Sequence, residues 1–386
     1  MLRSLYSGIS GLRAHQTMLD TTGNNIANVN TVGFKSSAVQ FQDTLSQMTK
    51  GSTGPQAEKG GTNPAQIGLG VQVAAISTNF AQGSAQSTGK ATDLMIAGNG
   101  FFTVSNGGDT LYTRSGAFDF DAQGRLTTAD GNFVQGWSAV GGEIDGGGPV
   151  GNITLPMKSV TAATPTTSAT INGNLPSDAA IGTEITRDLP IFDGNGVRTT
   201  VPLKFTRDAA GWTVNDGTAD IGTVTFTNGV RTSPATMTTG ATTLDLTAVS
   251  GYAKMTTVGI ESQNGSSAGT LESYSIGKDG TVTGSYSNGA IEKIAQIAIA
   301  TFVNPGGLEK AGGSTYRSGI NSGQLALGVA GTAGIGSLSG GYLEMSNVDL
   351  SQEFTNLIVA QRGFQANARI ITTSDSVLEE LIQLKR

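Results

Sequence analysis

The carboxy-terminal segment, residues 349–386, carries a row of apolar side chains spaced alternately by four and three positions. This spacing puts the row on one face of an α-helix and is typical of a coiled-coil seam. The row, with polar residues at Gln361 and Asp375, consists of Leu350, Phe354, Leu357, Phe364, Ala368, Ile371, Leu378 and Ile382. Asp349 stands where it can cap the first turn. Such a helix would be roughly 55 Å long, so we expect it to need a partner along its length.

The amino-terminal segment shows the same alternation of apolar positions. Its row consists of Leu5, Ile9, Leu12, Leu19 and Ile26, with Gln16 and Gly23 at the intervening places. The two ends of the chain therefore predict a pair of helices, parallel or antiparallel, joined by all the residues between them. Gly8, Gly11 and Gly23 each weaken a helix by about 1 kcal/mol relative to Ala. We therefore expect both ends to be loosely ordered in the free monomer.

These two rows allow two interpretations. They can pair with each other as an intramolecular stalk, or they can pack against other copies in an assembly. We favour the assembly, because small residues on the last helix would let further helices approach closely on more than one side of the row. These small residues are Ala360, Gly363, Ala366 and Ala368.

The middle of the chain predicts strands and turns. Short apolar runs between residues 71 and 137 alternate with Gly and Asn, which supply the positive φ of tight turns. Residues 149–285 hold turn dipeptides at regular intervals, which favours an inserted antiparallel β barrel or sandwich. The predicted fold is mainly β, with two β-rich domains and a terminal helical coiled-coil stalk. Its predicted parts are a helical part (1–30 plus 350–386), an extended arm (31–70 plus 341–349), a first β domain (71–145 plus 285–340) and an inserted outer β domain (146–284).

The composition narrows the functional classes. The 386 residues include 56 Gly and no Cys, and only 13% are charged, with a net charge of −6. An acidic chain is a poor partner for nucleic acid, and without Cys there are no disulfides or thiolate metal sites. We find neither an apolar run long enough to span a membrane nor a cleaved signal peptide of the common kind.

Candidates for chemistry are weak. His15 is the only histidine, so a catalytic triad or a histidine metal site would depend on it alone. Residues 119–130 partly resemble a calcium loop, but the bidentate Glu is missing and the flanks predict strands, so two turns are the better interpretation. We therefore expect no catalytic residue, no metal and no cofactor.

Three blocks of sequence occur in a specific order. They are Asn24–Lys35, Gly341–Leu350 and Ile358–Arg369. They resemble the amino-terminal signature, the lead into the last helix and the carboxy-terminal signature of the flagellar rod and hook protein family, and residues 93–137 are a looser match. The residues that carry the resemblance most clearly are Asn24, Asn25, Asn28, Thr31, Gly33, Phe34, Ser346, Asn347, Val348, Gln361 and Arg362.

The resemblance implies a structural protein rather than an enzyme. Subunits of this kind stack into a curved hollow tube, the hook, which transmits torque from rod to filament as a universal joint. The inserted domain expected at 146–284 favours a hook member, because rod members of the family lack a large insertion. The alternatives are a distal rod protein or, in another class, a secreted β-rich adhesin.

The same resemblance implies the partners. These are further copies of the chain, rod proteins, hook cap and hook–filament junction proteins, and the flagellar type III export apparatus. The location implied is the hook and basal body of the bacterial flagellum, outside the cell after export without a cleaved signal peptide. Nucleic acid and membrane insertion are not expected.

Overall fold

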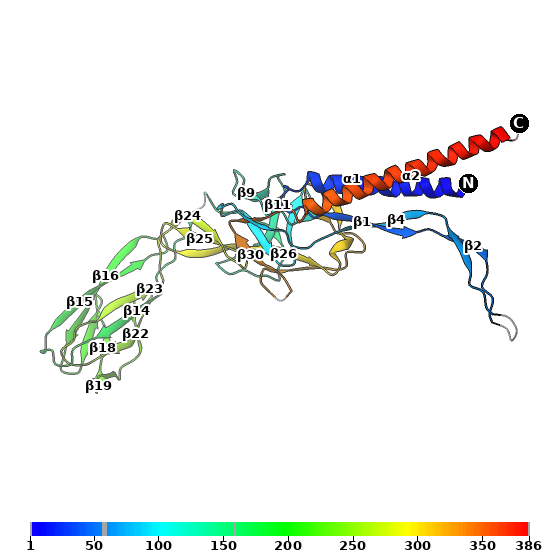
Figure 1. Ribbon diagram of the computed structural model, residues 1–386. Helices are drawn as coiled ribbons and strands as arrows, with labels where there is room; N and C mark the ends of the chain where they lie inside the picture. Colours follow the sequence, from blue (N-terminus) through cyan, green and yellow to red (C-terminus); the bar gives the residue numbers. More distant parts are fainter. Residues whose placement is uncertain (1, 56–59, 158–159, 333, 385–386) are drawn as a thin grey trace. The chain divides into compact units, whose positions relative to one another are not determined.

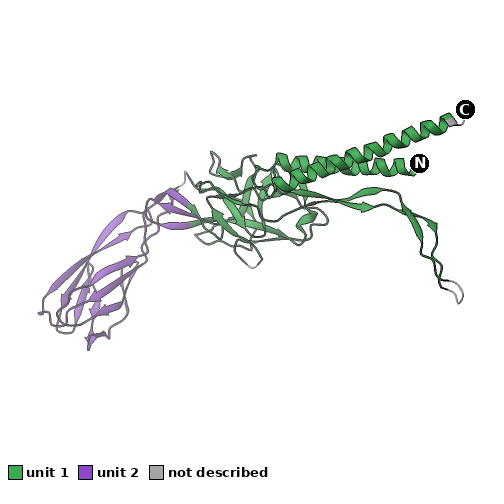
Figure 2. Cartoon of the chain, in the orientation of Figure 1, with its two compact units in different colours: residues 1–155, 275–282, 293–386 green, residues 156–274, 283–292 purple. Residues whose placement is uncertain are grey.

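The structure is a computed structural model that describes residues 2–55, 60–157, 160–332 and 334–384. The chain forms two compact units, coloured separately in Figure 2. Unit 1 contains residues 1–155, 275–282 and 293–386, and unit 2 contains residues 156–274 and 283–292. The prediction of a mainly β protein with a helix at each end is confirmed. The division into four parts stays a prediction.

The two ends of the chain form helices that lie side by side in unit 1 (Figure 1). They are α1, Leu2–Ala27, and α2, Leu350–Leu384. Ser4 lies opposite Ser374, and Asn25 lies opposite Glu353, so the helices are antiparallel. Asp349 caps α2, since its carboxylate accepts hydrogen bonds from the backbone N–H of Ser351 at 2.8 Å and of Gln352 at 3.2 Å.

An extended arm of antiparallel strands follows α1 (Figure 1). One pair of strands continues into the next, and most of their side chains are exposed. Its strands are β1, Ser37–Asp43; β2, Ser46–Lys50; β3, Ala65–Gly68; and β4, Val71–Thr78.

The β part of unit 1 has a main apolar core and a second, smaller cluster of mostly aromatic residues. Long strand β26 pairs with both β11 and β7, and its residues Ile297 and Ile299 are fully buried. Phe102 packs edge-on against Phe118 with ring centroids 4.9 Å apart. The strands assigned wholly or partly to this core are β5, Ala85–Ser87; β6, Leu94–Ala97; β7, Phe101–Asn106; β8, Asp109–Thr113; β9, Phe118–Phe120; β10, Leu126–Thr128; β11, Phe133–Ser138; β12, Gly151–Asn152; β26, Ile291–Phe302; β27, Glu309–Gly312; β28, Thr315–Arg317; β29, Leu325–Val329; β30, Ser337–Gly340; and β31, Tyr342–Glu344. A short 3₁₀ turn, η1, spans Pro305–Gly307.

Unit 2 has a core of its own between two four-stranded sheets. One sheet has the order β21-β22-β14-β23 and the other β15-β16-β17-β18. Buried residues from both sheets, including Leu244 and Trp212, form one cluster. The strands of these sheets are β14, Ser168–Asn174; β15, Glu184–Phe192; β16, Arg198–Arg207; β17, Trp212–Asn215; β18, Asp220–Val224; β21, Thr236–Thr239; β22, Thr242–Ser250; and β23, Gly259–Gln263.

The short strands outside these sheets complete unit 2. Those strands are β13, Val160–Thr161; β19, Phe226–Thr227; β20, Val230–Arg231; β24, Gly269–Ile276; and β25, Thr281–Tyr286. The unit boundary falls within β24, β25 and β26.

The predicted inserted domain is therefore a sandwich, and its described strands form no closed barrel. The expectation of antiparallel strands was wrong at one place, because β14 and β22 pair in parallel. A parallel pair needs a long crossover. Here the whole second sheet, β15 to β18, lies in the chain between those two strands.

Candidate self-assembly site

The contact between α1 and α2 is made by small and polar residues. A Cβ on Gly11 would lie 2.6 Å from the Asn367 amide, and a Cβ on Gly363 would lie 2.5 Å from the ring of His15. Ala360 on α2 is fully buried, at 0% exposure, and Ala14 on α1, at 3% exposure, lines a cavity with residues of the arm such as Val71. The glycines that weaken α1 by propensity thus allow the two helix backbones to approach closely.

The predicted apolar rows lie mostly outside this contact. Ile371 is half-buried and would touch a side chain placed at Gly8. Other members are well exposed, with Phe354 at 52% and Ile382 at 70%. Among the described side chains, none of these large apolar members of either row is fully buried: Leu5, Leu12, Leu19, Ile26, Leu357, Ile371 and Leu378 are intermediate, and Ile9, Leu350, Phe354, Phe364 and Ile382 are exposed.

The signature residues near α1 gather at a junction between the helices and the β core, here defined as residues 24–37, 79–83, 114–115 and 344–353. Asn25 is buried; its amide donates to the backbone oxygen of Ser37 at 2.8 Å and to Glu353 Oε1 at 3.0 Å, and its oxygen accepts from the Ser37 N–H. A plain helix cap would make only local bonds. This asparagine instead connects α1, the start of β1 and the first turn of α2.

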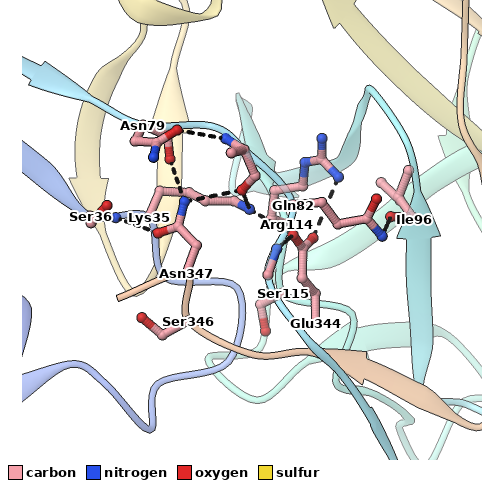
Figure 3. A network of polar contacts seen from close by, with 12 residues as sticks. Lys35, Ser36, Asn79, Gln82, Ile96, Arg114, Ser115, Glu344, Ser346 and Asn347 are labelled. Carbon is pink, nitrogen blue, oxygen red and sulfur yellow. Dashed lines mark hydrogen bonds and ion pairs between the residues drawn. The ribbon is translucent and has the colours of Figure 1, made fainter. Parts of the chain in front are cut away.

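Asn347 makes the matching set of contacts from the other end of the chain. Its side-chain oxygen accepts from the backbone N–H of Ser36 at 2.8 Å, and its amide donates to the backbone oxygens of Asn79 and Ala81 at 2.8 and 3.0 Å (Figure 3). One side chain thus satisfies backbone groups from two separate segments. This explains why an asparagine serves at this position.

Gly33 has no room for a side chain. Its φ is +68°, and an added Cβ would lie 2.5 Å from the backbone nitrogen of Ser115. Its N–H donates to the backbone oxygen of Glu344 at 2.7 Å. The glycine therefore lets the segment after α1 lie directly against the β core.

The other signature residues divide into local and exposed ones. Asn28 bonds to Asn24, and Thr31 bonds to Asn28, within the turns that end α1. Phe34 lies under the Lys310 ammonium at 5.4 Å from the ring centroid. Ser346 accepts from the Val348 N–H at 3.3 Å, and Gln361 and Arg362 lie exposed on α2, away from the junction.

The centre of the junction is a buried ion cluster that the sequence pattern did not single out. Lys35 Nζ lies 2.6 Å from Glu344 Oε1, and Arg114 Nη1 lies 3.4 Å from Glu344 Oε2 (Figure 3). Burial lowers the pKa of the Lys35 ammonium against the opposing effect of the Glu344 carboxylate. Both Lys35 and Glu344 lie inside the blocks that carry the family resemblance. A charged residue within an otherwise apolar and amide-rich block was the sequence signal that could have indicated this cluster.

The histidine and the calcium-like loop that the sequence offered as chemical candidates have ordinary structural surroundings. His15 is wedged against Gly363 and lies 6.1 Å from the Phe41 ring, measured between centroids. The calcium-like residues 119–130 contain the end of β9, a turn in which Asp121 accepts from the backbone N–H groups of Gln123 and Arg125, strand β10 and the start of a second turn. The interpretation as two turns agrees with this arrangement. In the part of the chain that the structure describes, no group of three or more His, Asp and Glu side chains is arranged to hold a metal ion.

Likewise, no helix in the described ranges has a stretch that is both long and apolar enough to cross a membrane.

Family models match three parts of the chain. Residues 5–35 match the model described as flagella basal body rod protein, and residues 95–174 match the D1 domain of flagellar hook protein FlgE/F/G. Residues 339–384 match the model of the C-terminal part of the flagellar basal body rod FlgEFG proteins. The matches at both ends include the helices and the junction described above.

Curated relatives extend over the whole chain. It is 39% identical over 442 aligned residues to the flagellar hook protein FlgE of Borreliella burgdorferi, with 100% of both chains covered. It is 36% identical over 387 residues to the flagellar basal-body rod protein FlgG of Bacillus subtilis, again with 100% of both covered. The hook protein FlgE of Salmonella typhimurium is 34% identical over 420 residues, covering 99% of this chain and 100% of the relative.

A solved structure supports the same fold. The crystal structure of the Helicobacter pylori flagellar hook protein FlgE2 aligns with a TM-score of 0.50 at 14% identity, covering 67% of this chain and 100% of that one. Full-length relatives at 34–39% identity establish common descent, and most of these relatives carry the hook name. The chain belongs to the flagellar hook protein FlgE family.

Proposed function

We propose that this protein is the structural subunit of a flagellar hook, and that copies of it assemble into a hollow helical tube through the terminal helices. The observation that carries the proposal is the apolar surface left on α2. Phe354, Ile358 and Val359 are 52%, 56% and 54% exposed. Large exposed apolar patches mark interaction surfaces. The intramolecular helix contact leaves these side chains free to pack against other copies.

The predicted rows take part in this assembly as the contact surface of each copy. Leu350 and Phe354 stand one turn apart on α2, and Leu5 and Ile9 stand one turn apart on α1. Burying one such side chain contributes about 1.5–3 kcal/mol. Repeated along two helices and many copies, these contacts are sufficient to hold a tube.

The proposed mechanical role depends on a contrast between the helices, which would line the inside of the tube, and the β domains, which would form its outer surface. Apolar helix seams make a stiff lining, whereas the rest of the chain has few charges and many glycines. Exposed ion pairs contribute well under about 1 kcal/mol each. Outer surfaces of this kind can slide on their neighbours, so the tube can bend as it rotates and act as a universal joint.

The assembly implies further flagellar partners. A tube between rod and filament contacts rod proteins at one end and hook–filament junction proteins at the other, and a cap protein is needed while it grows. The subunit reaches this place through the flagellar type III export apparatus and acts outside the cell. The role is one of construction, not catalysis.

A distal rod protein is the second candidate, and one observation favours it. The chain is 36% identical over its full length to the rod protein FlgG of Bacillus subtilis. Hook and rod differ in shape, since a hook is curved and a rod is straight. Electron microscopy of tubes grown from the purified protein distinguishes them, with curved tubes expected.

The assembly surface is tested by the double variant Phe354→Gln/Ile358→Gln. Losing two buried apolar side chains should raise the critical concentration for assembly by at least about tenfold. The matched control is Thr355→Gln, which places the same side chain at the adjacent exposed position of α2. Sedimentation of polymer measures the effect, and circular dichroism checks the fold. Assembly of the double variant at the wild-type concentration would contradict the proposed surface.

A further inference from the structure

The charges buried in the junction do not balance. The side chains of Lys35, Glu344 and Arg114 are 0%, 0% and 3% exposed. Two cations therefore share one carboxylate away from water. Among the described residues, Glu344 is the carboxylate that acts electrostatically on either cation. An uncompensated buried charge is strongly unfavourable, so one positive charge in this cluster needs a partner.

The two cations share the carboxylate unequally. Lys35 Nζ contacts Glu344 Oε1 at 2.6 Å and donates to the backbone oxygen of Ala81 at 2.7 Å. Among the described residues, Arg114 has one hydrogen-bond acceptor, Glu344 Oε2, which it contacts through Nη1 at the long distance of 3.4 Å. Its Nε is buried and has no acceptor in the part of the chain that the structure describes. The underpaired cation is therefore Arg114.

The nearest phenol does not supply the missing negative charge. Burial raises the pKa of Tyr316 to about 12, with smaller electrostatic effects from Arg114 and Glu344. The phenol is therefore neutral at physiological pH. A guanidinium, by contrast, keeps its proton in proteins.

A cavity of about 270 Å³ lies against Arg114. Its walls include Phe80, Phe101 and Phe302, which belong to one aromatic cluster with Tyr316. The Arg114 guanidinium carbon stands 5.3 Å from the centroid of the Phe101 ring. In Figure 3 one guanidinium nitrogen faces Glu344 and another points away from it. The cavity thus combines apolar aromatic walls with an underpaired cation, as ligand pockets commonly do.

We propose that this cavity binds a carboxylate carried on an apolar body, either a ring or the methylene groups of a side chain, with the Arg114 guanidinium as its anion-binding group. A carboxylate in the cavity can accept a charge-assisted hydrogen bond from the part of the Arg114 guanidinium that Glu344 does not occupy. The aromatic walls accommodate the apolar body. The carboxylate belongs either to a free small molecule or to a side chain of a second copy of this chain.

The probe is benzoate, and neutral benzamide is its matched control. Benzoate added to the full-length monomer should raise the unfolding temperature, because a ligand that binds only the folded state stabilises it. It should also move the Arg114 Nε–Hε resonance in a nuclear magnetic resonance titration. Benzamide should do neither. If benzoate leaves that resonance of the wild-type chain unmoved, or if both compounds act alike, the proposal is overturned.

The variant is Arg114→Met, which leaves Lys35 and Glu344 as a balanced pair. Benzoate should bind it at least about tenfold more weakly. The control is Arg125→Met, because Arg125 also stacks on a phenylalanine, Phe133 at 4.3 Å, but is already paired with a carboxylate. Unchanged benzoate binding in Arg114→Met would overturn the proposal. If that variant does not fold, the wild-type resonance titration decides.

A second experiment distinguishes the two sources of the carboxylate. It is the only experiment here that rests on the proposed assembly. Benzoate is added to assembled tubes. Loss of binding on assembly assigns the cavity to a carboxylate side chain of a second copy, and retained binding assigns it to a small molecule. Either result supports the site, and a failure to form tubes would count against the proposed function while leaving the monomer result in place.

Discussion

Individual glycines decide how the terminal helices meet. Gly8 and Gly11 stand where α2 comes closest, and a side chain at either place would run into Ile371 or Asn367. Gly23 stands on the same helix, but an added Cβ there would meet nothing within 4 Å. Equal residue types in one helix therefore have unequal roles. Two allow close packing, and the third only reduces helix propensity.

The unequal roles predict unequal effects of the same substitution. Gly11→Leu should weaken the pairing of the helices by about 1–3 kcal/mol, as overpacking does. Gly23→Leu should stabilise α1 by about 1 kcal/mol through helix propensity. The dissociation temperature of tubes assembled from each variant measures both effects. This temperature should fall below the wild-type value only for Gly11→Leu. Equal effects of the two variants would show that the close approach at Gly11 is unimportant.

At the same scale, single side chains join parts of the chain that are far apart in sequence. Lys35 and Glu344 are 309 positions apart and form a fully buried ion pair. Asn25 bonds to Glu353 over 328 positions. Breaking a buried ion pair typically destabilises a protein by about 3–5 kcal/mol. These contacts hold both helices on the β core of unit 1.

At the scale of elements, α1 and α2 are helices that leave their large apolar side chains partly or well exposed. Among the described helix positions, Ala14 and Ala360 are the apolar side chains that are buried. Most helical stability in proteins comes from burying an amphipathic face. A pair that buries small and polar residues, and leaves its large apolar ones outside, is weakly stabilised in one copy.

This weak pairing predicts a change in order on assembly. In the free monomer, the backbone amides of residues 2–27 and 350–384 should exchange rapidly with deuterium, whereas in assembled tubes they should be protected. Strand β26 is the internal control, because residues 295–300 are buried in the core of unit 1 and should exchange slowly in both states. Slow exchange of both helices in the monomer would contradict this prediction.

At the scale of the whole molecule, unit 2 is an insertion with its own core. Its buried cluster is made only of residues between 169 and 258. The boundary of this unit differs from the predicted insertion, 146–284, in a way that matters for experiments. Ile153 and Leu155 are buried, and both belong to unit 1. A deletion over 146–284 would remove them.

A deletion of the larger segment of unit 2, residues 156–274, should separate assembly from curvature. Replacing residues 156–274 by a short glycine linker should leave a chain that still forms tubes, because the terminal helices are intact. The tubes should be straight or buckle, because outer contacts are lost. Electron microscopy of the tubes measures the outcome. The chain that lacks residues 146–284 should be less stable than the chain that lacks 156–274 by several kcal/mol, because it loses buried side chains of unit 1. Failure of the shorter deletion to assemble would refute this division of roles.

The sequence alone determined those features that depend on neighbouring residues. The four-three spacing predicted both helices, because helix periodicity is a local property, and Asp349 caps the second helix as its place before the first turn indicates. Turn residues predicted the β-rich middle for the same reason. The signature blocks at both ends also identified the kind of protein, because they are runs of adjacent residues.

Tertiary structure decided which faces and which charges meet. The apolar rows suggested a seam, but the helices approach closely at Gly11 and Gly363, because close backbone approach depends on the partner. The buried cluster of Lys35, Arg114 and Glu344 had no local signal of pairing, since its members come together only after the chain has folded. Sequence periodicity specifies each element by itself, whereas burial and charge balance belong to the folded chain.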